Sequence, residues 1–414
     1  MTSVASRRVA IIGAALSANK GAAAMAETVI ERLPSFVGDC RFDLLTTYPE
    51  DDIGRVPSSS PVTVVGLQPM RLALVEIPVA VLAWVARRVR LPLGWVRTRA
   101  CRSILDADVV VDVAGISFVD GRGMPILVYN TLMTGLPLLL GTPTVKAAQA
   151  LGPFETLPNR WLAHRVLGHL AAVCARGART REHLDGLGLS NVVDVADLAF
   201  SLDEAGSLPL DVEQRVAAAG EHIVVMPSAV VKKLFEREDA SRGYVDAMVD
   251  LVSGLRRVTG LSVVIAPHSY RVGEPEGRMN DGPVCREIAV RLAGDPGTVL
   301  VDADLSAGEL RHLVAGARVL VTSRFHAMIS GLATATPTVV VGWSHKYREV
   351  LRDFSLEDYG CEAALLADTE SVVSKVVEAS MNREAVIASI RAALPAVRLR
   401  SEKNFSVIAS AMAG

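Results

Sequence analysis

The sequence predicts an α/β protein that contains two doubly wound (Rossmann-like) domains in tandem. The chain has 414 residues, which is too long for one compact core and suits two domains of ordinary size. Half of its residues are hydrophobic and 21% are charged, so it has enough apolar side chains to bury two large cores. Short apolar runs flanked by glycine alternate with longer helical patterns, which is typical of parallel sheets covered by helices on both faces.

In the first half, the apolar runs are continuous rather than alternating, so each predicted strand is expected to be buried on both faces. The predicted strands are residues 9–13, 109–113 and 138–141, and the predicted helices are residues 21–33, 124–134 and 161–170.

A polar stretch with glycine and proline, residues 201–214, interrupts this rhythm and predicts a linker. We expect an N-terminal domain at residues 1–205, a C-terminal domain at 206–385 and a helix at 386–414 that packs back toward the first domain. After the linker, strands are predicted at 222–226, 262–266, 299–301, 319–322 and 338–341, and helices at 245–257, 284–292, 308–315, 327–333 and 347–351.

Charge and cysteine content exclude some classes of protein. The formal net charge is −2, which argues against a nucleic-acid-binding protein that relies on counterion release. The five cysteines are scattered, with no C-x-x-C pair, so the sequence predicts neither a disulfide framework nor a zinc site. Scattered cysteines fit a reducing compartment, and we expect a cytoplasmic protein. The N-terminal apolar run is interpreted as a buried strand and not as a secretory signal.

Residues 72–86 form the most apolar segment, and three arginines at 87, 88 and 90 follow directly. Glu76 and Pro78 interrupt the segment, which is shorter than the ~20 apolar residues of a spanning helix, so we do not expect it to cross a membrane. Two interpretations stay open. The segment is either a buried helix that covers the domain, or a helix lying on an anionic membrane surface at the inner face of the membrane.

Candidate functional residues follow the predicted strands. In parallel sheets ligands bind beyond the carboxyl ends of the strands, and two such edges facing each other across the linker predict a cleft between the domains. In the first half, Ser17 and Asn19 lie in a turn that either contacts a ligand phosphate or caps the next helix. Asp120 follows another strand. Its carboxylate could bind sugar hydroxyls or act as a base, and the structural alternative is that it forms an Asx turn.

In the second half, basic side chains follow three strands. His268 comes after the strand at 262–266, and Ser323, Arg324 and His326 come after the strand at 319–322. Arg324 can bind a phosphate or carboxylate through two hydrogen bonds. His326 lies in the first turn of a helix, where a bound anion would stabilise its protonated form. Lys346, after the next strand, can add a further positive charge. The alternative is that Arg324 pairs with an acidic neighbour and His326 packs under its helix.

These motifs occur in a characteristic order. They are the loop 13–21, the turn 114–120, Gly152-Pro153-Phe154, the segments 181–188 and 197–200, Pro267-His268, Ser323-Arg324-Phe325-His326 and the segment 337–346. With this order and spacing, the chain resembles the polysaccharide pyruvyl transferase family from residue 13 to about residue 351.

The resemblance implies a glycosyltransferase-B-like pair of domains and a ketal-forming transferase. The donor would be phosphoenolpyruvate, and the product a pyruvate ketal on a cell-surface or extracellular polysaccharide or glycolipid precursor. In the family, the Arg and His of the R-x-H motif belong to the donor site and correspond to Arg324 and His326. A further basic residue early in the second domain also belongs to that site, and the nearest positions here are Lys232 and Lys233, lysines where the family has arginine. The first domain would bind a glycan or lipid-linked sugar, the second phosphoenolpyruvate, with no metal and no cofactor.

The chemistry of the residues agrees with this expectation. His326 would protonate the methylene carbon of phosphoenolpyruvate, and Arg324 and Lys346 would hold its phosphate and carboxylate. His268 or Asp120 would accept the proton of the attacking hydroxyl. Two alternatives stay open. One is a glycosyltransferase of the same architecture with a nucleotide-sugar donor, and the other is a catalytically silent glycan-binding protein.

Overall fold

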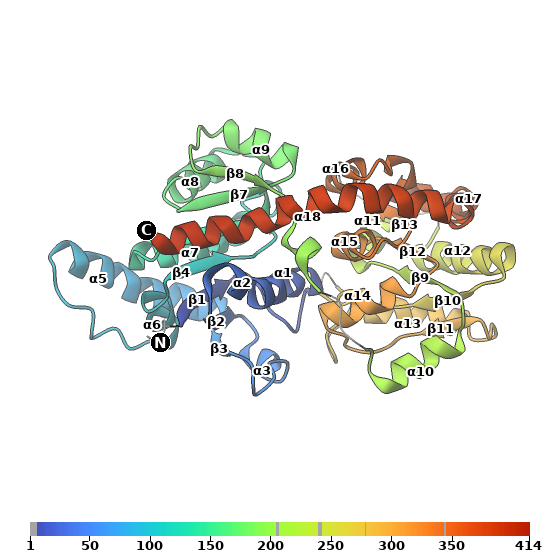
Figure 1. The fold of residues 1–414 in the computed structure, drawn as a ribbon, viewed down its shortest axis with the longest axis horizontal. Helices are drawn as coiled ribbons and strands as arrows, with labels where there is room; N and C mark the ends of the chain where they lie inside the picture. Colours follow the sequence, from blue (N-terminus) through green and yellow to red (C-terminus); the bar gives the residue numbers. More distant parts are fainter. Residues whose placement is uncertain (1–5, 204–206, 239–241, 278, 343–344) are drawn as a thin grey trace. The chain divides into compact units, whose positions relative to one another are not determined.

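A computed structural model of the chain describes residues 6–203, 207–238, 242–277, 279–342 and 345–414 (Figure 1). Its contacts form two compact units. Unit 1 comprises Met1–Ser17, Ala22–Leu202 and Arg398–Gly414, and unit 2 comprises Ala18–Gly21 and Asp203–Val397. The expected domain boundary after residue 205 lies outside the described residues.

Unit 1 contains a parallel sheet in the order β3-β2-β1-β4-β6-β7-β8, with the short strand β5 paired to β6. Side chains that alternate along β1 enter two different cores. Val9 and Ile11 belong to one core, and Ala10 and Ile12 to the other. The sheet is therefore covered on both faces, as the continuous apolar runs predict. The strands are β1 Arg7–Ile12, β2 Cys40–Thr46, β3 Val62–Gly66, β4 Val109–Asp112, β5 Ile116–Ser117, β6 Thr144–Leu151, β7 Ala172–Arg176 and β8 Val192–Val195.

The helices of unit 1 lie between these strands (Figure 1). They are α1 Lys20–Arg32, whose first two residues belong to unit 2, α2 Pro34–Val37, α3 Pro49–Ile53, α4 Pro69–Arg71, the π-helical η1 Leu72–Glu76, α5 Ile77–Arg88, α6 Arg99–Leu105, α7 Met124–Leu140, α8 Leu157–Leu167, α9 Ala178–Asp185 and the 3-10 turn η2 Leu198–Ser201.

The strand predicted at residues 138–141 is wrong. These residues are the last turn of α7 and its cap, and the strand is β6, Thr144–Leu151. Gly141 has φ +77°, and its amide donates a hydrogen bond to the carbonyl of Pro137 at 2.8 Å. A glycine in this left-handed conformation commonly ends a helix. A short apolar run after proline fits a strand or a helix end equally well, and only the position of Gly141 separates the two.

Unit 2 contains a parallel sheet in the order β11-β10-β9-β12-β13-β14. Along β9, Ile223 and Val225 enter one core while Val224 and Met226 enter the other, so this sheet is also doubly wound. The predicted strands at 222–226 and 319–322 match β9 and β12. The strands are β9 His222–Met226, β10 Ser262–Ile265, β11 Thr298–Leu300, β12 Val319–Thr322, β13 Thr338–Gly342 and β14 Gly360–Glu362.

The helices of unit 2 follow the same alternation. The predicted linker is shorter than expected, because α10 begins at Leu210. The helices are α10 Leu210–Ala218, α11 Ala229–Glu238, α12 Tyr244–Thr259, α13 Gly282–Arg291, α14 Ala307–Ala315, α15 Phe325–Ala333, α16 His345–Asp353, α17 Thr369–Met381 and the 3-10 turns η3 Glu357–Tyr359 and η4 Ala363–Ala367.

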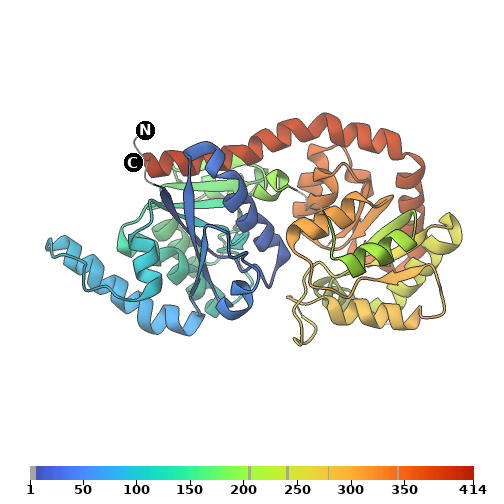
Figure 2. The ribbon, with the colours of Figure 1, turned by 60° about the horizontal axis from the view of Figure 1, so that its bottom comes forward.

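The last helix, α18 Arg383–Ala413, contributes to both units (Figure 2). Its residues after 397 belong to unit 1, where Phe405 and Ile408 join a core. In the same unit, Ser401 donates to the carbonyl of Asp197 at 2.8 Å, and Asn404 donates to the carbonyl of Ala196 at 3.1 Å. These contacts fix the C-terminal part of the helix on unit 1.

Candidate functional site

The segments that follow β9, β10 and β12, and the first turn of α16 after β13, lie at one edge of the unit 2 sheet, because these strands are parallel and adjacent. The loop after β10 carries His268, the loop after β12 carries Ser323 and Arg324, and the first turns of α15 and α16 carry His326 and Lys346. The strand ends predicted from the sequence therefore bring these five side chains to the same edge, where parallel sheets bind ligands.

Asp281 connects three of these loops and is not among the site residues predicted from the sequence. Its carboxylate is fully buried and accepts hydrogen bonds from the backbone amides of Ala229 at 2.9 Å and Ser269 at 3.0 Å. It also forms an ion pair with the guanidinium of Arg324. The carboxylate thus fixes the loops after β9, β10 and β12 together. A signal was present in the sequence, since Asp281-Gly282-Pro283 is typical of a helix start.

Arg324 is largely buried, with its side chain 13% exposed. Burial acts to lower the pKa of Arg324, but the charge and hydrogen bond of Asp281 outweigh it, so the pKa is raised and the guanidinium stays charged. The acidic partner named as an alternative in the sequence analysis is therefore present. Its ion pair with Asp281 orients the guanidinium, and an anionic ligand would have to share Arg324 with that carboxylate.

His326 lies on the first turn of α15 and packs against the short segment Ala18–Gly21 of unit 2. A Cβ atom on Gly21 would come within 2.0 Å of Nδ1 of His326, so a larger residue at this position would force the imidazole to move. Asn19 accepts a hydrogen bond from the amide of Gly21 at 3.0 Å, and the ammonium of buried Lys20 lies 2.7 Å from a carboxylate oxygen of Asp304. The loop after β1 therefore contributes to the surroundings of His326, and Asn19 shapes that loop.

His268 is 5% exposed and lies among basic groups. Burial lowers the pKa of His268 well below its ordinary value, and the charges of His326, Arg324 and Lys20 lower it further. The imidazole of His268 is therefore neutral near pH 7, in the form that accepts a proton rather than donates one.

Two aromatic rings link the helices that carry His326 and Lys346. The rings of Phe325 and Tyr347 are 5.5 Å apart, and the hydroxyl of Tyr347 donates to the carbonyl of Ser323 at 3.1 Å. The Lys346 ammonium lies 4.9 Å from the centre of the Phe325 ring. Lys346 is thereby held beside the loop after β12. Ser323 is 4% exposed, and its carbonyl is occupied by this packing.

Lys232, on α11, forms ion pairs with Glu276 at 3.0 Å and Glu287 at 3.4 Å. Burial acts to lower the pKa of Lys232, but the two glutamates raise it. The lysine remains charged, and the two carboxylates that hold it compete with an external anion. Its role in the donor site stays a prediction.

In unit 1, Asp120 lies between β5 and α7, and its carboxylate contacts the residues that lead into α8. It accepts hydrogen bonds from the amides of Glu155 at 2.7 Å and Thr156 at 3.4 Å, from Nδ2 of Asn159 at 3.1 Å, and from the Thr156 hydroxyl. Burial acts to raise the pKa of Asp120, but these hydrogen bonds outweigh it and lower the pKa. These contacts join Asp120 to residues 35 to 39 positions further along the chain, so they are not the local Asx turn of the alternative, and a carboxylate so strongly hydrogen-bonded is a weak base. Ser17 is also buried, and its amide donates to Asp52 at 2.7 Å.

A buried polar cluster at the end of β4 was missed by the sequence analysis. Asp112 and Lys146 are each 1% exposed and form an ion pair. Gln149 donates to Asp112 at 2.7 Å and accepts from Ser117 at 2.6 Å, and Lys146 also donates to Thr134 at 3.0 Å. Burial lowers the pKa of Lys146 against the opposing effect of Asp112. The cluster orders the loops at this end of the unit 1 sheet.

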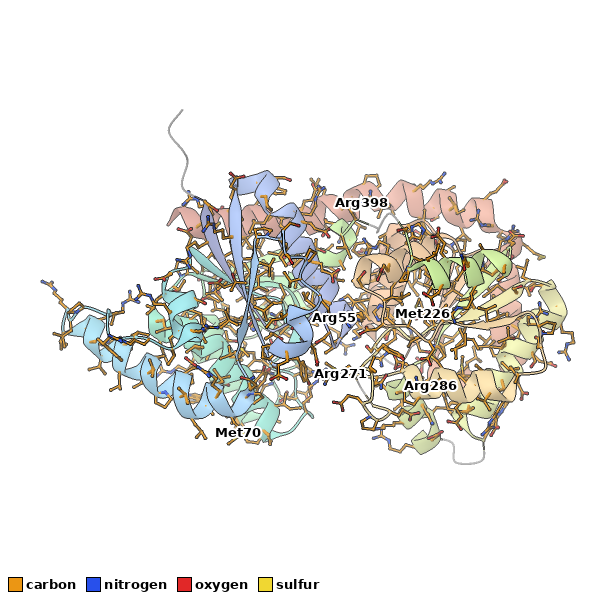
Figure 3. The ribbon with its side chains drawn as sticks, turned by 90° about the horizontal axis from the view of Figure 1, so that it is seen from below. Arg55, Met70, Met226, Arg271, Arg286 and Arg398 are labelled. Atoms are coloured by element: carbon orange, nitrogen blue, oxygen red, sulfur yellow. The ribbon has the colours of Figure 1, made fainter. Side chains whose placement is uncertain are left out.

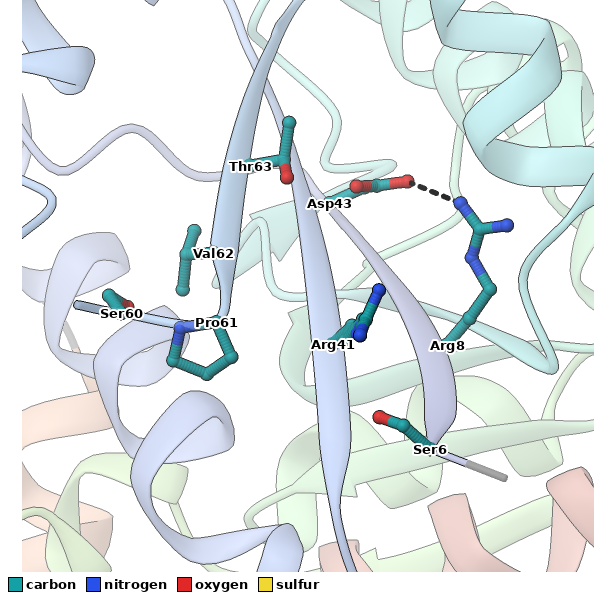
Figure 4. Close-up of a pocket in the computed structure, with 8 residues that line it drawn as sticks. All are labelled: Ser6, Arg8, Arg41, Asp43, Ser60, Pro61, Val62 and Thr63. Atoms are coloured by element: carbon teal, nitrogen blue, oxygen red, sulfur yellow. Dashed lines mark ion pairs between the residues drawn. The ribbon is translucent and has the colours of Figure 1, made fainter. Parts of the chain in front are cut away.

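A pocket of about 570 Å³ lies elsewhere in unit 1 (Figure 4). It is lined by residues at the N-terminal ends of β1, β2 and β3, including Arg8, Arg41 and Val62. The guanidinium of Arg8 lies 4.0 Å from the carboxylate of Asp43. This is the amino edge of the parallel sheet, opposite to the edge at which such sheets bind ligands. We therefore place the candidate site at the carboxyl edge of unit 2. Within the described residues, no three His, Cys, Asp or Glu side chains are grouped to hold a metal ion.

Comparison with solved structures identifies the fold. The chain is similar to a UDP-GlcNAc 2-epimerase from Neisseria meningitidis bound to UDP-GlcNAc, with 10% identity, 98% of this chain and 100% of that chain covered, and a TM-score of 0.60. It is also similar to a putative UDP-N-acetylglucosamine 2-epimerase from Listeria monocytogenes, with 13% identity, 97% and 94% covered, and a TM-score of 0.59. The trehalose-6-phosphate synthase OtsA matches with 10% identity, 99% of each chain and a TM-score of 0.58. At such identities the likeness shows the fold alone, which is of the glycosyltransferase-B type.

Comparison of sequences identifies the family. The amylovoran biosynthesis protein AmsJ of Erwinia amylovora is 24% identical over 314 residues, which cover 72% of this chain and 71% of AmsJ. The sequence model of the family described as polysaccharide pyruvyl transferase matches residues 19–345, a stretch that includes Asn19, His268, Arg324 and His326. The resemblance predicted from the order of the motifs is therefore confirmed, and the chain belongs to the polysaccharide pyruvyl transferase family.

Proposed function

We propose that this protein transfers the enolpyruvyl group of phosphoenolpyruvate to two hydroxyls of a sugar, forming a pyruvate ketal and releasing phosphate. Membership of the family supports a transferase of polysaccharide biosynthesis. The observation that carries the finer proposal is the convergence of His268, Arg324, His326 and Lys346 at one edge of the unit 2 sheet. Phosphoenolpyruvate carries a phosphate and a carboxylate, and an edge rich in basic groups suits such an anion.

In the proposed reaction, His326 donates a proton to the methylene carbon of phosphoenolpyruvate, which becomes the methyl group of the ketal. A sugar hydroxyl then attacks the adjacent carbon and loses its proton. The carbon–oxygen bond to phosphate breaks, and the second hydroxyl closes the ring with loss of its own proton. One phosphate leaves for each ketal formed, and no oxidant or reductant is needed.

The protein groups have separate tasks in this scheme. Arg324, oriented by Asp281, and Lys346, held over Phe325, stabilise the negative charge of the donor. His268 is neutral and can accept a hydroxyl proton, and its lowered pKa means that it passes that proton on readily rather than holding it. We assign the sugar acceptor to unit 1 and propose that the reaction takes place in the cytoplasm, where phosphoenolpyruvate is available.

Incubation of the purified protein with phosphoenolpyruvate and candidate glycans tests the proposal. The expected result is phosphate release together with a glycan whose mass has increased by that of pyruvate less water. Thermal-shift titrations with phosphoenolpyruvate and with UDP-sugars distinguish the nucleotide-sugar alternative, because a ligand that binds the folded state raises the melting temperature. Stabilisation by UDP-sugars and not by phosphoenolpyruvate would refute the proposal.

A further inference from the structure

The helix formed by α4, η1 and α5 has an unusual distribution of side chains. It runs without a break from Pro69 to Arg88 and is long and apolar enough to cross a membrane by length and composition. The face that packs on unit 1 carries mainly small side chains, with Ala80, Ala83 and Ala86 buried along it. A helix whose role is to fill a core places its large side chains inward. Here the large apolar side chains are on the outside.

The outward face is apolar along its whole length. Leu74 is 66% exposed and Leu82 is 59% exposed, and only 28% of the most apolar part of the helix is buried. The helix and the loop that follows it extend away from the unit 1 sheet (Figure 2), and Met70 is labelled at the start of the helix in Figure 3. The exposed large apolar residues of this segment are Met70, Leu74, Val75, Val81, Leu82, Trp84, Val85, Val89, Leu91 and Trp95.

The charges around this apolar face have one sign. Residues 67–105 contain seven arginines and one acidic residue, Glu76, which is buried and paired with Arg71 at 2.9 Å. Four arginines at the end of this helix, in the following loop and at the first residue of α6 are exposed, and no described carboxylate lies within ion-pair distance of them. The four are Arg88, Arg90, Arg97 and Arg99. This local excess of positive charge contrasts with the net charge of −2 for the whole chain.

We propose that this surface, defined as the outward face of Pro69–Arg88 with residues 89–99, docks on an anionic phospholipid bilayer. Apolar side chains that enter the boundary of the acyl chains, with arginines at the level of the headgroups, are the features of a helix that lies in a membrane interface. Trp84 and Trp95 are of the type enriched at that interface, and the guanidinium of Arg88 lies 4.0 Å over the Trp84 ring. This inference does not depend on the proposed chemistry.

Two other occupants fit the structure less well. A helix that spans the bilayer would leave unit 1, but Leu72, Ala80 and Ala83 belong to a core of that unit, and Arg87 donates to the carbonyl of Leu140. A second copy of the chain, docked through the same face, would bring like charges toward each other, which opposes association.

Flotation with lipid vesicles tests the inference. Vesicles of phosphatidylcholine alone are compared with vesicles of phosphatidylcholine and phosphatidylglycerol in about equal parts. We expect binding to the anionic vesicles, weakened by salt. Arg88→Gln with Arg97→Gln is expected to weaken it by about 30-fold, and Leu74→Ser with Leu82→Ser by at least as much.

Matched control variants come from unit 2. Leu210→Ser with Val290→Ser changes equally exposed apolar residues, and Arg237→Gln with Arg257→Gln removes the same charge. Both controls are expected to bind vesicles like the unchanged protein. Turnover of phosphoenolpyruvate with a soluble acceptor, measured for all variants, separates a failure of docking from a failure of the proposed function.

Three results would overturn the inference. The first is equal vesicle binding by the unchanged protein and both test variants. The second is no vesicle binding by the unchanged protein, together with a dimer in light scattering that the leucine variant dissociates. The third is a protein that alkaline carbonate cannot extract from cell membranes, as expected of a spanning helix.

Discussion

Replacement of Asp281 by asparagine tests how the candidate site is held together. Asp281 is fully buried and is the partner of Arg324 and of the amides of Ala229 and Ser269. Asparagine keeps the shape but removes the charge, so Arg324 loses its carboxylate partner, and one position that accepted a hydrogen bond becomes a donor. Removing one member of a buried ion pair costs about 3–5 kcal/mol of the free energy of unfolding.

Urea unfolding followed by circular dichroism measures this change. With a denaturant slope of about 2–3 kcal/mol/M, a loss of about 3–5 kcal/mol should lower the midpoint of the unfolding transition by about 1–2.5 M. Asp246→Asn is the matched control, because Asp246 also pairs with an arginine of unit 2, Arg291, but both side chains are well exposed. An exposed pair is worth about 0–1 kcal/mol, so this control should scarcely move the midpoint. Equal midpoints for the two variants would refute the assigned role of Asp281.

Three further predictions concern the same edge of unit 2. His326→Ala should lower kcat/KM for ketal formation by about 100-fold or more while the circular dichroism spectrum is unchanged. Arg324→Ala should lower both activity and stability. Near-normal turnover in either variant would contradict the assigned roles. Gly21→Ala should reduce activity because the new Cβ would displace the His326 ring. Gly294→Ala is the control, because open space surrounds Gly294, and it should not reduce activity. Equal activities of the two variants would show that the packing of Gly21 against His326 has no effect. The pKa of His268 is lowered on folding, so the unfolded chain binds more protons, and stability should decline as the pH falls below the ordinary pKa of 6.5 toward the lower folded value. His268→Gln should remove up to about 1.4 kcal/mol per pH unit of that slope in unfolding titrations, and an unchanged slope would exclude the effect.

The sequence predicts the fold class well because the signal is local and repeated. The continuous apolar runs of β9 and β12 are typical of buried strands in a covered parallel sheet, and both match the structure residue for residue. The run at residues 138–141 fails because four apolar residues after proline fit a helix end as well as a strand. Strands β2 and β3 were not predicted, since they are separated by short helices and carry polar residues such as Asp43 and Thr63.

The candidate site is predicted less completely, because its contacts join residues far apart in the chain. Arg324 and His326 follow directly from a strand end, which the sequence shows. Their partners do not, since Asp281 is 43 residues from Arg324. The proximity of Gly21 to His326 is likewise invisible in the sequence. Spacing along the chain therefore identifies the groups with functional chemistry, but not the neighbours that set their charge and orientation.

Hydrogen–deuterium exchange, measured with and without phosphoenolpyruvate, tests the central claim most directly, because it needs no acceptor and locates the ligand. The account predicts slower exchange in peptides that cover residues 267–271 and 323–326 of unit 2, and loss of that protection in His326→Ala or Lys346→Ala. Protection confined to unit 1, or protection by UDP-sugars and not by phosphoenolpyruvate, would contradict it.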